Sequence, residues 1–274
     1  MRLVGPGDPP EGARIAWRLE DAHGEIAAGA EPATLRIVAP RGGGVRLVDL
    51  ELEARAPDGR LLSRNRLELC VAPPLGGDAP ALNPIDEDAV SLLARLRWPN
   101  VAAEPGTARA LLATRLTTPA REHLLAGRPV LVVANHDDAL VDPERALPAS
   151  DRHNFPRMNL RKRDGTPWDG RWMGGFAWRR TDGPWAALAG GPMLDEHWQG
   201  LTPNYVLTGF LSTAFTGLVD AGIVVAWLHH AAAFVKRTRL GAGQLTVSTF
   251  ELSTSAASEN PLAPHLLAAI AASS

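Results

Sequence analysis

A change in hydrophobic period near residue 75 limits the folds open to this chain more than any other feature. Before it, apolar and polar side chains alternate in short runs such as ARIAWRLED, ATLRIV, VRLVDLELEAR and RLLSRNRLELCVAP. Period-two alternation is typical of strands with one buried face. Asp58 and Gly59, between the last two runs, form a favoured hairpin turn. Residues 1–75 therefore predict a partial immunoglobulin-like β-sandwich, with about five strands where a complete one has around seven.

Prolines and glycines interrupt every regular pattern between Pro73 and Pro80, where the chain reads PPLGGDAP. Proline lacks an amide donor and glycine lacks backbone restraint, so neither extends a helix or a strand. We place a domain boundary here, with a linker at 76–86. Beyond it, helical patterns cover 87–96, 108–114 and 118–127, and a continuous apolar run at 129–134 predicts a buried strand. Alternation of helix and buried strand predicts an α/β domain with a parallel sheet, of the flavodoxin-like kind, over 87–274.

The C-terminal stretch predicts a compact unit of strand, hairpin and helix. The apolar run at 223–228 is rich in β-branched residues, as buried strands are. Two further β-rich runs, at 233–240 and 244–252, flank the turn Gly241-Ala242-Gly243. After Pro261 the sequence LAPHLLAAIAA favours a helix, because proline is tolerated in a first turn and alanine and leucine propagate it.

Five of the eight tryptophans fall in residues 151–200, among several glycines and prolines. A stretch of this length without regular structure is uncommon in a compact domain, and so many indoles argue against disorder. We therefore predict a long, packed insertion. It offers a candidate ligand site in which indoles stack on a sugar ring and polar side chains bind its hydroxyls, formed by Trp168, Asp169, Arg171 and Trp172. Packing against the scaffold is the competing interpretation of the same residues.

Polar residues follow the predicted strand at 129–134, where the chain reads Asn135-His136-Asp137-Asp138, with Asp142 shortly after. Open α/β sheets bind ligands at the carboxyl ends of their strands, so a metal or sugar-hydroxyl site is one interpretation and a solvated turn is the other. His229 follows the strand at 223–228. With His230 it does not form the i, i+4 pair that binds zinc on a helix, so no metal is predicted.

Composition excludes several classes of partner. With 28 basic and 30 acidic residues the net charge is −2, which gives no uniform basic field for nucleic acid or an acidic membrane. The short basic run Arg161-Lys162-Arg163 is typical of a solvated loop. The single Cys70 permits no internal disulfide, and no run reaches the ~18 apolar residues of a membrane helix. We expect a cytoplasmic protein without a cofactor.

Four segments carry a resemblance to a known family: RNRLELCVAP, WDGRW at 168–172, PNYVLTG at 203–209, and GAGQLTVSTFEL followed by NPL. In this order they resemble the C-terminal region of glycoside hydrolase family 2 proteins, the β-galactosidase-like group. The resemblance implies an immunoglobulin-like module followed by a domain similar to class I glutamine amidotransferases or to the trehalose-utilisation (ThuA-like) fold.

The resemblance brings no catalytic residue to this sequence. Family 2 hydrolysis implies two glutamates of a (β/α)₈ barrel held about 5 Å apart, and no such series of strands and helices occurs here. The barrel is expected upstream, so we interpret the chain as a fragment or a truncated reading frame. Amidotransferase chemistry needs a cysteine at a strand-to-helix turn, whereas Cys70 lies in the predicted sandwich.

Two functions remain open at this point. The first is a non-catalytic accessory region that supports the barrel, mediates homo-oligomer contacts and binds carbohydrate. The second is a stand-alone ThuA-like or amidotransferase-like enzyme for a small carbohydrate-related molecule, using the polar groups near Asn135–Asp138 and His229. A pure carbohydrate-binding module is a third, narrower form of the first.

Overall fold

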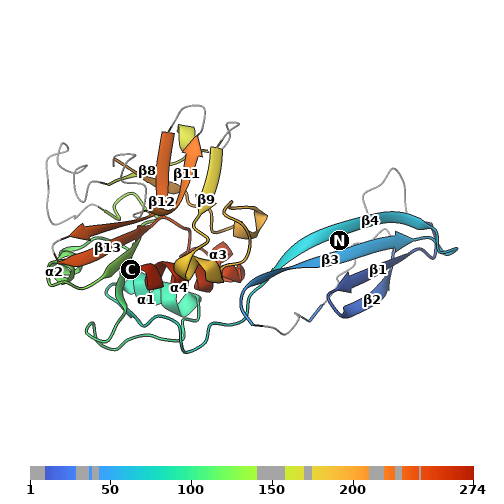
Figure 1. The fold of residues 1–274 in the computed structure, drawn as a ribbon, viewed down its shortest axis with the longest axis horizontal. Coiled ribbons are helices and arrows are strands. Elements are labelled where there is room, and N and C mark those ends of the chain that lie inside the picture. Colours follow the sequence, from blue (N-terminus) through green and yellow to red (C-terminus); the bar gives the residue numbers. More distant parts are fainter. Residues whose placement is uncertain are drawn as a thin grey trace. The chain divides into compact units, whose positions relative to one another are not determined.

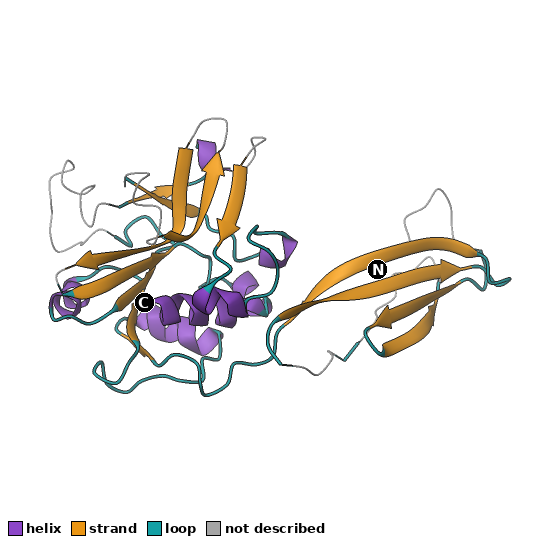
Figure 2. Ribbon diagram, viewed as in Figure 1, coloured by secondary structure: helices purple, strands orange, loops and turns teal. Residues whose placement is uncertain are grey.

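The computed structural model describes residues 10–28, 37–38, 43–140, 158–169, 175–209, 219–225, 230–240 and 242–274. The chain divides into two compact units, Met1–Pro73 and Pro74–Ser274. In its described residues the first unit is built of strands, whereas the second combines helices with a larger sheet (Figures 1 and 2). Helices and sheets together agree with the α/β class in its broad sense.

The first unit is one antiparallel sheet in the order β2-β1-β3-β4. Its strands are β1 (Arg14–Leu19), β2 (Ala22–Ala27), β3 (Arg46–Arg55) and β4 (Leu61–Val71). The sequence alternation appears as two faces, because Ile15, Leu19 and Leu50 lie in a buried cluster while Arg18 pairs with Glu51 at 2.7 Å. The predicted turn before β4 is confirmed, with Gly59 at φ +85°.

The described part of this unit shows one sheet and no second layer, so the immunoglobulin-like sandwich stays a prediction. Most of the predicted strand ATLRIV lies outside the described residues. Strand β2 was not predicted. It pairs with β1 across a two-residue turn at Glu20 and Asp21.

The second unit contains a nine-stranded mixed sheet in which β5-β6-β7-β13-β12-β10-β8 form the main path and β11 and β9 extend from β12. The strands are β5 (Leu82–Pro84), β6 (Ala110–Ala113), β7 (Val130–Val133), β8 (Asn159–Lys162), β9 (Gly175–Arg179), β10 (Tyr205–Thr208), β11 (Val219–Val225), β12 (His230–Leu240) and β13 (Gly243–Ser248). Strands β5, β6, β7 and β13 are parallel neighbours, and the other pairings are antiparallel. The predicted parallel sheet thus accounts for one half of a mixed one.

Four α-helices and three short 3₁₀ helices complete the described part of the second unit: α1 (Glu87–Arg95), α2 (Thr118–Leu125), α3 (Ser255–Glu259), α4 (Leu262–Ser273), η1 (Pro167–Asp169), η2 (Gly183–Ala187) and η3 (Glu196–Trp198). Helices α1, α2 and α4 confirm predicted ones. Side chains cap α1 and α2, because Asp86 accepts from Ala89 N at 2.7 Å and Thr117 from Ala120 N at 3.5 Å. None of the described helices has the length and apolar content to span a membrane.

Three sequence predictions are wrong in this unit. The predicted helix at 108–114 is strand β6, whose four residues are all buried between neighbouring strands, so tertiary packing overrides the helical preference of alanine and leucine. The predicted linker at 76–86 contributes β5, which pairs with β6. The tryptophan-rich stretch at 151–200 is not a separate insertion, because it supplies β8 and β9 to the sheet.

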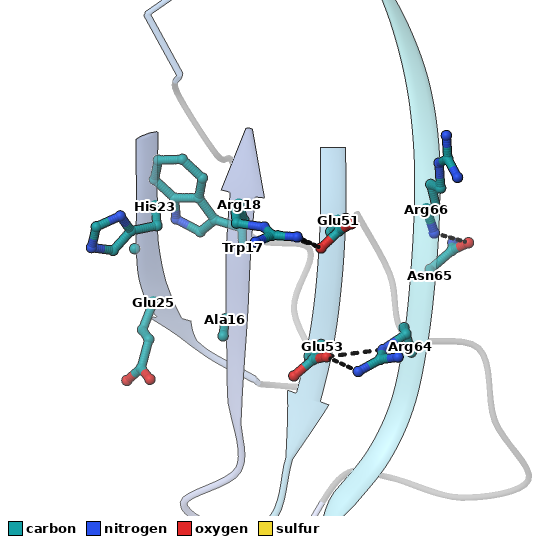
Figure 3. A pocket seen from close by; sticks show the side chains of 11 residues that line it. Ala16, Trp17, Arg18, His23, Glu25, Glu51, Glu53, Arg64, Asn65 and Arg66 are labelled. Carbon is teal, nitrogen blue, oxygen red and sulfur yellow. Dashed lines mark hydrogen bonds and ion pairs between the residues drawn. The ribbon is translucent and has the colours of Figure 1, made fainter. Parts of the chain in front are cut away.

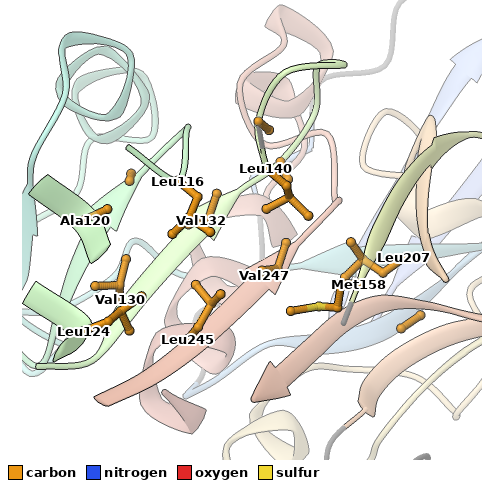
Figure 4. Close-up of a cluster of buried hydrophobic side chains, with 14 of the residues drawn as sticks. Leu116, Ala120, Leu124, Val130, Val132, Leu140, Met158, Leu207, Leu245 and Val247 are labelled. Carbon is orange, nitrogen blue, oxygen red and sulfur yellow. The ribbon is translucent and has the colours of Figure 1, made fainter. Parts of the chain in front are cut away.

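One buried cluster of the second unit joins α2 to β7, β10 and β13 (Figure 4). Leu124, Val130 and Leu245 gather at one of its ends, and Met158 and Leu207 at the other. Each such side chain contributes roughly 1.5–3 kcal/mol on burial. This packing fixes the positions of β7, β13 and β10. Polar residues lie at the ends of these three strands.

Candidate functional site

Along one edge of β12 the neighbouring strand changes from β13 to β10. Ser248, the last residue of β13, pairs with Val235, while Leu207 of β10 pairs with Ala233. The carboxyl end of β13 therefore meets the amino end of β10 on the same side of β12. Ligands of open α/β sheets bind outside the carboxyl ends of strands where the chain paths diverge. The polar residues here, called the carboxyl-edge cluster, are Asn135, His136, Asp137, Lys162, Tyr205, Glu251 and Ser253.

Asp137 lies between a phenol and an ammonium group. Tyr205 Oη donates to Asp137 Oδ1 at 3.1 Å, and Lys162 Nζ lies 3.5 Å from Asp137 Oδ2. The Lys162 and Asp137 side chains are 60% and 69% exposed, so a ligand can reach both. Their ion pair contributes at most about 1 kcal/mol to stability because it is solvated. Asp137, a predicted site residue, is thus held in place by β8 and β10.

Tyr205 is a buried donor at this site, 6% exposed. Burial, the hydrogen bond to Asp137 and the negative charges of Asp137, Glu251 and Asp138 raise the pKa of Tyr205 to about 12. The phenol therefore stays protonated at neutral pH and continues to donate. The sequence did not single out Tyr205 as a site residue. It belongs to the segment PNYVLTG at 203–209, one of the four that carry the family resemblance.

Glu251 and Ser253 follow β13. Glu251 is buried, and burial raises the pKa of its carboxyl group. Its Oε1 accepts from Asn204 N at 3.3 Å, which ties the end of β13 to the start of β10. Ser253 Oγ accepts from Asn135 Nδ2, which ties the end of β13 to the end of β7. Sequence reasoning missed Glu251 and Ser253, because residues 244–252 were assigned to a strand and 253–260 to a polar break.

His136, another predicted site residue, does not contact Asp137 in a dyad. Its Nε2 lies 3.2 Å from Thr114 O, on the loop after β6. That loop is in turn fixed by Asp86, which accepts from Thr114 N at 2.7 Å. The ends of β5, β6 and β7 are thereby joined, and the imidazole serves as part of that connection. Asp138 is exposed beside it.

Trp168 and Asp169, predicted to stack on and bind a sugar, are connected to this edge through Arg163. Its Nε donates to Trp168 O at 2.7 Å, its Nη1 to Pro203 O at 2.6 Å and its Nη2 to Asp169 O at 3.4 Å. Burial lowers the pKa of Arg163, and the charge of Asp169 opposes that shift. The prediction of a solvated basic run is therefore wrong for Arg163, although Arg161 and Lys162 are exposed.

Several predicted residues lie outside the described residues: Arg171, Trp172, His229 and Asp142. Trp185 and Trp198, from the same tryptophan-rich stretch, are buried in the core. In the part of the chain that the structure describes, no group of three or more histidine, cysteine, aspartate or glutamate side chains is placed to hold a metal ion.

A hollow of about 800 Å³ lies on the N-terminal sheet around Ala16 (Figure 3). Its walls carry Arg18 paired with Glu51 and Arg64 paired with Glu53. Both arginines are largely exposed, each is already paired with a glutamate, and the hollow contains none of the predicted site residues. We therefore place the candidate site at the carboxyl-edge cluster, where buried and exposed polar groups from four strands meet.

No protein-family model matches the chain, and no curated protein matches it either.

Proposed function

We propose that this chain is a non-catalytic accessory region of a glycoside hydrolase family 2-like enzyme, and that its carboxyl-edge cluster binds a carbohydrate. The observation that carries the proposal is the pairing of exposed Asp137 with Lys162 and with the buried hydroxyl of Tyr205. A carboxylate and an ammonium group side by side supply an acceptor and a donor. A sugar hydroxyl needs both.

The surrounding residues support binding over catalysis. Ser253 is hydrogen-bonded to the side-chain amide of Asn135, and His136 to a backbone carbonyl. The serine is therefore not bonded to the histidine, as a nucleophile would be to its base. Nucleophilic catalysis by a serine needs a base within hydrogen-bond reach of its hydroxyl. The half-buried indole of Trp168, held through Arg163, offers an apolar surface on the adjoining segment. An indole face matches the apolar face of a sugar ring.

A binding titration with a matched variant tests this function. Methyl β-galactoside is titrated into wild type and into Asp137→Asn, with heat as the readout. Asp137→Asn removes one charge, and hydrogen bonds to charged groups contribute roughly 1.5–3 kcal/mol, so affinity should fall about 10-fold or more. Asp58→Asn is the control, since Asp58 caps an exposed turn of the other unit through Arg60 N and should leave affinity unchanged.

Two results would overturn the proposal. One is the absence of heat with any galactose-type sugar up to high millimolar concentration. The other is sustained turnover of a chromogenic β-galactoside or of glutamine that is lost in Asp137→Ala or His229→Ala, which would support the stand-alone enzyme instead. Binding without turnover, weakened only in Asp137→Asn, supports the accessory region.

A further inference from the structure

Strand β4 has an open edge. It is the last strand of its sheet and pairs with β3 alone among the strands that the structure describes. It runs for 11 residues, about twice the usual strand length. The amide of Arg66 donates to Oδ1 of its neighbour Asn65 at 2.9 Å (Figure 3). Backbone groups at an open edge are a template for another strand.

We propose that β4 is a self-association edge, at which β4 of a second copy of this chain pairs antiparallel and in register about Leu67. Because such a pair has two-fold symmetry, one residue must face its own copy. With Leu67 at the axis, Arg66 of each chain faces Glu68 of the other. The two sheets then form one eight-stranded sheet across the axis.

Charge complementarity selects this register. The face of β4 that carries charges reads Arg64, Arg66, Glu68. Both arginines already pair with an acidic residue of β3, so in the dimer each Glu68 would add a second partner to an exposed guanidinium. Sliding the second strand by two residues one way places Arg66 opposite Arg66, and sliding it the other way places Glu68 opposite Glu68. Like charges directly opposite each other are destabilising, whereas opposite charges contribute roughly 0.2–1 kcal/mol a pair. Only the register centred on Leu67 gives two attractive pairs without a like-charge pair beside the axis.

The apolar residues of β4 fit the same arrangement. Leu67 is 39% exposed and pairs with Leu50, a member of the buried cluster of this sheet. Leu69 and Val71 already pack against that cluster. Pairing of two copies about Leu67 would cover the exposed side of this leucine with its own copy and continue the apolar face from one sheet into the next.

Cysteine cross-linking of the full chain tests the register. Opposite Cα atoms of an antiparallel pair lie about 4.5–5.5 Å apart, within the range of a disulfide. Leu67→Cys combined with Cys70→Ser, which removes the only native cysteine, should oxidise to a covalent dimer. Asn65→Cys with Cys70→Ser is the control. Its two thiols would be offset by four residues, or about 13 Å along the strand.

Sedimentation of the wild type and of charge variants completes the test. The wild type should dimerise, Arg66→Glu should weaken the dimer about 10-fold, and the swap Arg66→Glu/Glu68→Arg should restore most of that loss because complementarity returns. The proposal is overturned if the wild type sediments as a monomer at all concentrations and Leu67→Cys stays uncross-linked. It is equally overturned if Asn65→Cys cross-links as fast as Leu67→Cys.

Discussion

Replacing Arg179 by methionine should destabilise the second unit by about 3 kcal/mol, because this arginine organises the segment after β9 from inside the fold. The side chain is 1% exposed. Its Nη1 donates to the carbonyls of Arg180 and Trp185 at 2.9 and 3.1 Å. Its Nη2 donates to those of Leu188, Ala189 and Gly190 at 3.1, 2.7 and 3.0 Å. Five carbonyls of one segment thus depend on a single guanidinium.

The magnitude follows from two opposing contributions. Hydrogen bonds to a charged group contribute roughly 1.5–3 kcal/mol each, so five bonds exceed the cost of holding the guanidinium away from water, which is several kcal/mol. Burial lowers the pKa of Arg179, which is the signature of that cost. Loss of the guanidinium leaves the buried carbonyls of Trp185 and Leu188 without a donor, which costs about 1–3 kcal/mol for each. The other three carbonyls are only partly buried and can bind water, so we take about 3 kcal/mol for the whole substitution.

The assay is urea denaturation with thermal unfolding, both followed by circular dichroism. For a unit of this size a loss of 3 kcal/mol lowers Tm by about 6–12 °C. Arg109→Met is the matched control, since exposed Arg109 makes a single carbonyl bond, to Ala272 O at 3.1 Å, and its loss should cost under about 1 kcal/mol. The reasoning is refuted if Arg179→Met and Arg109→Met unfold with the same free energy.

Three further results are expected. Because burial raises the pKa of Glu251, the folded state binds the proton more tightly than the unfolded state, and stability falls as pH rises from about 4 through the raised value. The stability of Glu251→Gln relative to wild type should therefore grow over that interval and then level off, and a constant difference would contradict the pKa direction. Tyr205 is the only tyrosine, so alkaline titration of the ultraviolet phenolate band should give a pKa of about 12 that falls in Asp137→Asn; an unchanged value would exclude the hydrogen bond. A Cβ on Gly243 would lie 2.5 Å from Leu124 O, so Gly243→Ala should cost about 1–3 kcal/mol, whereas Gly191→Ala, with nothing within 4 Å, should cost little.

Local sequence signals predicted the elements that depend on local interactions. The helical patterns of α1 and α2, the turn at Gly59 and the apolar run of β7 are each set by residues adjacent in the sequence. The hairpin of β12 and β13 follows from its two β-rich runs. Local signals gave the wrong prediction for β6. The sequence ALLA favours a helix, and only its position between β5 and β7 makes it a strand.

The candidate site was predicted only where it follows a recognisable strand. His136 and Asp137 were singled out because they come directly after β7. Tyr205 and Lys162 come from β10 and β8, and only the sheet order brings them to Asp137. Glu251, which follows β13, is joined to the start of β10 through Asn204 N. A sequence pattern does not contain that order, because β10 and β8 pair across an interval of more than forty residues. Arg163 could not be placed from the sequence for the same reason. Its guanidinium donates to Pro203 O, forty residues further along the chain.

Saturation-transfer NMR with methyl β-galactoside tests the central claim most directly, because one spectrum reports both binding and cleavage of the sugar. We predict transfer of saturation from wild-type protein to the sugar ring, a much weaker transfer with Asp137→Asn, and an anomeric signal that stays constant over a day. No transfer to the sugar, or the growth of a free-galactose signal, would contradict a carbohydrate-binding region that leaves its ligand intact.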